Sequence, residues 1–199
     1  MLTTRHVLFL LPFISLPALA APAGIEGSID DASIRRKVDL VYVETVAGSP
    51  PSTGKAVIDQ KGNTYLPHVL PVVVGTTVTF HSFDPELHNV FARGSKRVLF
   101  NQAVLPQMHF DQTFKELGVV QLTCNIHKEM RAYVVVLQNP YFAIPDNKTG
   151  KFTLPAGLPA GTYTARIWGE KLSDEEKAKT FQITVGGGST APALHLAAR

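Results

Sequence analysis

Residues 119–136 read VVQLTCNIHKEMRAYVVV, with Cys124, His127 and Met130 at C-x2-H-x2-M spacing. An apolar run leads to the cysteine, a short polar segment follows, and a second apolar run leaves the methionine. Short Val-rich runs of this kind are typical of buried β-strands. The stretch therefore predicts two strands joined by a loop that carries three side chains able to bind a metal.

A fourth candidate ligand, His88, lies upstream at the start of the run HNVFA. Two imidazoles, one thiolate and a thioether are the donor set that selects copper in a trigonal blue site. Zinc is the main rival metal, and the methionine argues against it. Cys124 is also the only cysteine in the chain, so it has no intramolecular disulfide partner. A buried inert thiol is the alternative, but it leaves the spacing of His127 and Met130 unexplained.

The N-terminus has the composition of a secretory signal. A basic start at residues 5–6 is followed by apolar residues 7–19 and by small residues before Ala21. Residues 1–20 are therefore predicted to be a signal peptide, with an uncleaved anchor as the alternative. The apolar run is too short and too Pro-broken for a membrane span, and no later stretch is long enough. The mature chain is expected in the periplasm, with full secretion left open.

Export strengthens the case that the single cysteine binds a metal, because an unused thiol in an oxidising compartment is prone to oxidation or intermolecular pairing.

The net charge says little about function, since 19 Lys and Arg are balanced by 16 Asp and Glu, which gives +3. No basic cluster indicates nucleic acid as a partner, and no acidic run indicates a charged tail.

The mature chain is rich in short apolar or alternating runs separated by Gly and Pro. Pro67 and Pro71 mark one of these runs as an edge or bulged strand. Such a pattern predicts an all-β fold, with an antiparallel β-sandwich at its centre. Strands are predicted at residues 38–46, 55–59, 64–74, 76–82, 88–92, 96–100, 108–114, 118–123 and 131–137.

The chain changes character after residue 138. The C-terminal β segment is short for an independent core, so we expect it to pack on the sandwich or to complete a small second sheet with N-terminal strands. Residues 171–179 are charged and fit a short helix or an exposed loop. The predicted divisions are a signal peptide (1–20), an N-terminal strand and loop region (21–54), the sandwich domain (55–137), a C-terminal β segment (138–185) and a disordered tail (186–199).

Three pieces of residues 55–137 form a combined pattern: GTTVTF from Gly75, Asp84 followed by His88-Asn89-Val90, and G-V-V-x3-C-x2-H-x2-M from Gly118. This pattern resembles the cupredoxin family of plastocyanin-like blue copper proteins, and the short ligand loop is most similar to that of amicyanin. The resemblance implies a Greek-key cupredoxin β-sandwich that binds one type 1 copper per chain.

By the same resemblance, His88, Cys124 and His127 would be equatorial copper ligands and Met130 the axial one. Asn89 would hydrogen-bond near the thiolate and tie the ligand loops together. A second resemblance, of residues 141–168 to the end of carboxypeptidase-regulatory-like β-sandwich modules, carries no site residue.

The residues beside Cys124 bear on catalysis. Multicopper oxidases and copper nitrite reductases resemble cupredoxins but place a histidine next to the cysteine, whereas Thr123 and Asn125 stand there in this chain. We therefore predict a one-electron carrier and not an enzyme, with His127 as the solvent-facing exit route. Its partner would be an exported redox protein such as a cytochrome or an oxidoreductase.

Two other interpretations remain open. The chain could be a periplasmic copper-binding or delivery protein that uses the same ligands, or an adhesion module with a vestigial site. The remaining histidines are weaker candidates: His68 and His81 fit structural or surface roles, and His195 lies in the predicted tail. His109, beside Met108, could make a second surface copper contact or stand there by chance.

Overall fold

The computed structural model describes residues 24–49, 51–186 and 194–196. Within these residues nearly all regular structure is β-strand, and the two helices are short, α1 (Ala32–Arg35) and α2 (Asp174–Ala178). Neither helix in this part of the chain is long or apolar enough to cross a membrane. The predicted all-β class is confirmed.

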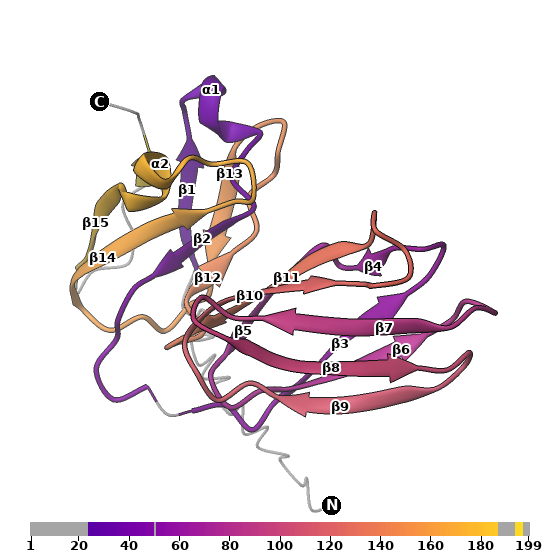
Figure 1. Ribbon diagram of the computed structural model, residues 1–199. Coiled ribbons are helices and arrows are strands. Elements are labelled where there is room, and N and C mark those ends of the chain that lie inside the picture. Colours follow the sequence, from indigo (N-terminus) through magenta and orange to yellow (C-terminus); the bar gives the residue numbers. More distant parts are fainter. Residues whose placement is uncertain (1–23, 50, 187–193, 197–199) are drawn as a thin grey trace, which may run out of the picture.

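Two sheets pack face to face in the larger part of the molecule, which we call the main sandwich (Figure 1). The first has the strand order β5-β11-β10-β7-β8 and the second β4-β3-β6-β9. The β5–β11 and β3–β6 pairs are parallel, and the other neighbours are antiparallel. This arrangement is consistent with the Greek-key cupredoxin β-sandwich.

The first sheet comprises β5 (Val69–Val73), β11 (Arg131–Leu137), β10 (Gly118–Thr123), β7 (His88–Arg93) and β8 (Val98–Val104). The second comprises β4 (Tyr65–Leu66), β3 (Lys55–Gln60), β6 (Thr77–Ser82) and β9 (His109–Thr113).

The core of the main sandwich follows from the alternation of residues along its strands. In β6, Val78 and Phe80 are fully buried, whereas Thr77, Thr79 and His81 lie on the opposite, partly exposed face. The buried cluster between the two sheets also takes in the cysteine and the methionine of the predicted ligand loop. That loop is therefore anchored in the core and does not stand free on the surface.

The two ends of the described chain build a second, smaller body, the terminal sandwich (Figure 1). Its sheets have the strand orders β13-β1-β16 and β12-β2-β14-β15, so N-terminal strands pair with C-terminal ones. This is one of the two arrangements expected for the C-terminal segment. The first sheet comprises β13 (Lys151–Leu154), β1 (Ile25–Ile29) and β16 (Leu194–Leu196). The second comprises β12 (Phe142–Ala143), β2 (Leu40–Val43), β14 (Gly161–Trp168) and β15 (Thr180–Val185).

A third buried cluster joins the two sandwiches. Leu40 and Trp168 of the terminal sandwich pack against Tyr133, Val135 and Leu137, which lie on one face of β11. The Trp168 and Tyr133 rings meet edge to face with centroids 5.1 Å apart. Because the other face of β11 fills the main core, this strand is buried on both sides.

Most strands lie where the sequence places them, and the differences have local causes. The run predicted at 64–74 is divided into β4 and β5, and β5 forms a sheet edge, as its prolines predicted. The charged segment 171–179 contains the short helix α2, which begins with a capping box between Ser173 and Glu176. The segment 186–199, predicted as a disordered tail, contains β16, which pairs with β1. The predicted signal peptide lies outside the described residues.

Candidate metal centre

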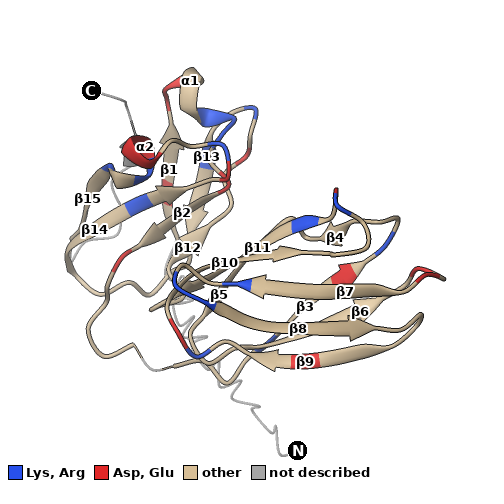
Figure 2. Ribbon diagram, viewed as in Figure 1, with Lys and Arg blue, Asp and Glu red and all other residues tan. Residues whose placement is uncertain are grey.

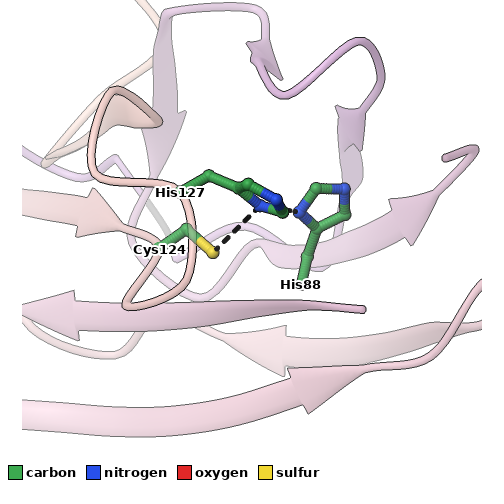
Figure 3. A group of neighbouring side chains, drawn as sticks. All are labelled: His88, Cys124 and His127. Carbon is green, nitrogen blue, oxygen red and sulfur yellow. Dashed lines mark hydrogen bonds between the residues drawn. The ribbon is translucent and has the colours of Figure 1, made fainter. Parts of the chain in front are cut away.

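Three strands of the main sandwich bring the predicted ligands to one end of the molecule. Cys124 directly follows β10, His127 lies in the loop that leads to β11, and His88 is the first residue of β7, which pairs with β10. In the structure, their side chains converge (Figure 3). A ligand atom from each of the three residues lies within 4.8 Å of those from the other two. Among the described residues, no other group of three or more His, Cys, Asp or Glu side chains is gathered in this way.

The spacing of the three donor atoms fits a metal ion. His88 Nδ1 lies 3.1 Å from His127 Nδ1, and His127 Nδ1 lies 4.0 Å from Cys124 Sγ. Two metal–ligand bonds of about 2.0–2.3 Å can span either separation. His88 is fully buried and Cys124 is 4% exposed, while His127 is partly exposed. The donor group is thus mostly buried, with one imidazole at its outer edge.

Asp84 determines which nitrogen of His88 faces the other donors. Its carboxylate lies 2.9 Å from His88 Nε2 and also accepts hydrogen bonds from the backbone N–H groups of Gly62 and Asn63. Burial by itself raises the pKa of the Asp84 carboxyl, but these hydrogen bonds outweigh it and hold the pKa below its usual value. An ionised Asp84 accepts the Nε2 proton of His88, so the lone pair of Nδ1 is left for the site.

Glu86 has the corresponding position beside His127. Its carboxylate lies 3.2 Å from His127 Nε2, which again leaves Nδ1 directed at the other donors. Glu86 is 61% exposed, so this pairing is solvated and weaker than the one between Asp84 and His88. Both acidic residues come from the loop between β6 and β7, whose acidic positions lie at the same end of the main sandwich (Figure 2).

Asn89 connects the two segments that carry the donors. Its side-chain oxygen accepts hydrogen bonds from the Asn125 backbone N–H at 2.7 Å and from the Cys124 thiol at 3.4 Å. Its amide group donates to the Asn101 side-chain oxygen at 2.7 Å. The bond to sulfur exists only while the thiol is protonated, whereas the other two fix the loop in either state.

Met130 closes the loop. Its N–H donates to the carbonyl of His127 at 3.0 Å, and its carbonyl accepts from the N–H of Cys124 at 3.3 Å. The side chain is 1% exposed and belongs to the same buried cluster as Cys124. The loop is therefore a compact turn with the thioether on its inner side.

Tyr65 is a buried support that the sequence did not reveal. It is fully buried, and its hydroxyl donates to the Asn89 backbone carbonyl at 2.7 Å. Burial raises its pKa, with a smaller contribution from Cys124 nearby, so the phenol stays protonated and keeps donating. The partners Tyr65, Asp84 and Glu86 were missed because their contacts depend on the fold; only the i, i+4 spacing of Asp84 and His88 is visible in the sequence.

The other histidines lie elsewhere. His68 contacts Glu170 at 2.9 Å and the Arg131 carbonyl at 3.0 Å, between the two sandwiches. His81 and His109 face each other across the β6–β9 pair. The side chain of His195 lies outside the described residues.

Comparisons with known proteins place cupredoxins among the structures similar to this chain. Neither a protein-family model nor a curated protein matches the sequence. A purple cupredoxin from Nitrosopumilus maritimus is 29% identical, with a TM-score of 0.37, over 41% of this chain and 98% of its own. A Cu(I) form of an amicyanin mutant is 26% identical, with a TM-score of 0.39, over 48% of this chain and 92% of its own. Amicyanin from Paracoccus versutus is 21% identical, with a TM-score of 0.38, over 48% and 96%. The second resemblance, of residues 141–168 to carboxypeptidase-regulatory-like modules, stays a prediction.

Proposed function

We propose that this chain is an exported type 1 copper protein that acts as a one-electron carrier and not as an enzyme. The observation that carries this proposal is the convergence of two imidazole nitrogens and one thiol in a mostly buried group, with a methionine closing the same loop. Nitrogen and soft sulfur donors together suit copper in both oxidation states. His88, Cys124 and His127 would hold the ion, with Met130 as a weak fourth ligand.

Bound copper would supply a reversible one-electron change, and the protein's own residues would hold the donors still during it. Asp84 orients His88, Asn89 fixes the loop at Asn125, and the buried strands on either side limit movement. A site whose donors are already in place needs little rearrangement on oxidation or reduction. Hydrolytic chemistry is not favoured, because the base nearest to the Cys124 thiol is His127, which shares one tight loop with it and whose Nδ1 lies 4.0 Å from the sulfur.

His127 is the proposed exit route for the electron. It is the one member of the donor group with appreciable exposure, 18% of its side chain. Around it, the loops at this end carry the exposed apolar residues Phe83, Leu87 and Ile126. Glu86 and the exposed pair at 128–129 add charge. An apolar surface patch with a polar rim suits transient binding of a protein partner. We propose that the partner is an exported redox protein such as a cytochrome or an oxidoreductase.

The deciding experiment is the visible and EPR spectrum of the mature protein loaded with Cu(II). We expect an intense thiolate-to-copper band and a narrow copper hyperfine splitting, both absent from the Cys124→Ala variant. His68→Ala serves as the matched control, because this histidine lies away from the donor group, and it should keep both signals. A pale spectrum with wide splitting, or tighter binding of zinc than of copper, would overturn the copper proposal.

A second measurement separates electron transfer from copper delivery. A carrier should pass through repeated cycles of oxidation and reduction with its metal retained in the presence of a chelator. Rapid loss of copper to the chelator would favour the delivery protein, for which the partly exposed His127 would be the point of exchange. Cell fractionation tests the proposed periplasmic location and the removal of residues 1–20.

A further inference from the structure

We propose that His81 and His109 form a second metal site, for a divalent transition-metal ion and Cu(II) above all, on the outer face of the β4-β3-β6-β9 sheet. The two residues are direct partners in the antiparallel β6–β9 pair. They share no residue with the donor group of Cys124, so this inference does not depend on the proposed function.

The register brings the two imidazoles together. The Ser82 N–H donates to the Met108 carbonyl, which makes those two residues a hydrogen-bonded pair of the ladder. The next pair, His81 and His109, is then a non-hydrogen-bonded pair, in which facing side chains stand closest. Their ring centroids are 6.0 Å apart, a gap that two metal–nitrogen bonds of about 2.0–2.1 Å and the rings themselves can span.

Both rings lie on the accessible face of the sheet. Phe80 and Phe110, the next pair along the ladder, stack on each other in the core with centroids 4.9 Å apart. Because side chains alternate along a strand, the histidines point the other way. His81 is half-buried and rests against the ring of Phe83, with centroids 4.0 Å apart, while His109 is exposed. One imidazole is thus held in place, and the other is free to turn toward it.

Among the described residues, the ring nitrogens of this pair are unengaged, in contrast to those of His68, His88 and His127. His68, His88 and His127 each have both ring nitrogens in contact with protein atoms. Within the described part of the chain, the ring nitrogens of His81 and His109 make no hydrogen bond or ion pair. They therefore remain available to an ion from solution.

The surroundings favour a cation. Asp59 is the partner of His81 on the neighbouring strand β3, and its carboxylate makes no hydrogen bond or ion pair among the described residues. Met108, 55% exposed, directly precedes His109 and offers a thioether. Among the divalent metals of the first transition row, Cu(II) is the one that imidazole nitrogens bind most tightly. Cu(II) is therefore the expected ion, and Zn(II) would bind more weakly.

The test is titration of the full chain carrying Cys124→Ala and His127→Ala, which removes the thiolate and one imidazole of the donor group, with Cu(II) and then with Zn(II) in a calorimeter. We expect a site of micromolar affinity, and we expect His109→Gln to lower that affinity by at least about tenfold. Loss of a residue that only supports a metal ligand already costs about tenfold or more, so loss of a ligand should cost at least as much. His68→Gln is the matched control, because that surface histidine already has two partners, and it should change nothing. Circular dichroism confirms that each variant is folded.

NMR line broadening gives a second readout that does not require a stable variant at the half-buried position. In the chain carrying Cys124→Ala and His127→Ala, substoichiometric Cu(II) should broaden the ring signals of His81 and His109 together, ahead of those of His68. Unchanged metal affinity in both His109→Gln and His81→Asn would overturn the proposal. So would the absence of selective broadening at these two rings.

Discussion

Asp84 has two tasks that only a carboxylate can combine. It accepts backbone hydrogen bonds from Gly62 and Asn63 and, at the same time, the Nε2 proton of His88. The side-chain amide of asparagine has one oxygen that accepts hydrogen bonds and one NH2 group that donates them. In either orientation, the NH2 group would face one of these N–H donors instead of an acceptor. We expect Asp84→Asn to lower metal affinity by about 10–100-fold, as loss of an outer partner of a histidine ligand does.

Equilibrium titration with Cu(II) measures this effect. Glu86→Gln is the matched control, because Glu86 pairs with the other imidazole but is 61% exposed. We expect that variant to bind the metal nearly as well as the unmodified chain, since exposed pairings contribute little. Equal losses in both variants would show that the buried carboxylate has no special role.

Asn89 supports a second prediction at this scale, on stability. Asn89→Ala removes the acceptor for the Asn125 N–H and the donor to Asn101 in one step. These two part-buried hydrogen bonds contribute about 0.5–1.5 kcal/mol each, so we expect a loss of about 1–3 kcal/mol of unfolding free energy, which urea denaturation can measure. Asn101→Ala removes only the second of these bonds and should cost less. A larger loss in Asn101→Ala than in Asn89→Ala would contradict the assigned role.

At the scale of elements, β11 shows what the sequence could and could not predict. Its uninterrupted apolar run, without alternation, is typical of a strand buried on both faces. The C-x2-H-x2-M spacing likewise places three donors in the loop before it, because neighbours in the chain must share a short loop. The cover of the outer face of β11 comes from Leu40 and Trp168, and no local pattern links such distant segments. For the same reason, the bonds from Gly62 and Asn63 to Asp84 could not be foreseen.

Trp168 provides the test of this packing. It is 8% exposed and meets Tyr133 edge to face on the outer side of β11. We expect Trp168→Ala to lower the free energy of unfolding by about 3–5 kcal/mol, because it leaves a cavity over the strand. Denaturant unfolding measures the loss, and Ile144→Ala, at a side chain that is 62% exposed, is the control. A cost below about 1 kcal/mol would show that the two sandwiches do not depend on this contact.

For the whole molecule, Glu170 is the main polar connection between the two sandwiches. It follows β14 of the terminal sandwich, and its carboxylate contacts His68, Arg131 and Tyr133 of the main sandwich at 2.9, 3.2 and 2.9 Å. Its backbone N–H donates to Asp39. The junction is thus fixed by an apolar contact and by a charged cluster whose strength depends on pH.

Burial by itself raises the pKa of Glu170, but the hydrogen bonds from His68, Tyr133 and Arg131 outweigh it and leave the pKa below its ordinary value of 4.5. A carboxyl whose pKa is lowered by folding stabilises the folded state above its unfolded pKa, and this stabilisation is lost as the pH falls through the folded pKa. The difference in unfolding free energy between the unmodified chain and Glu170→Gln should therefore shrink as the pH falls below about 4.5. Urea denaturation across this range measures it, and the difference isolates Glu170 from the other carboxylates that titrate there. A difference that grows on acidification would show that His68, Arg131 and Tyr133 do not hold Glu170 in its ionised form.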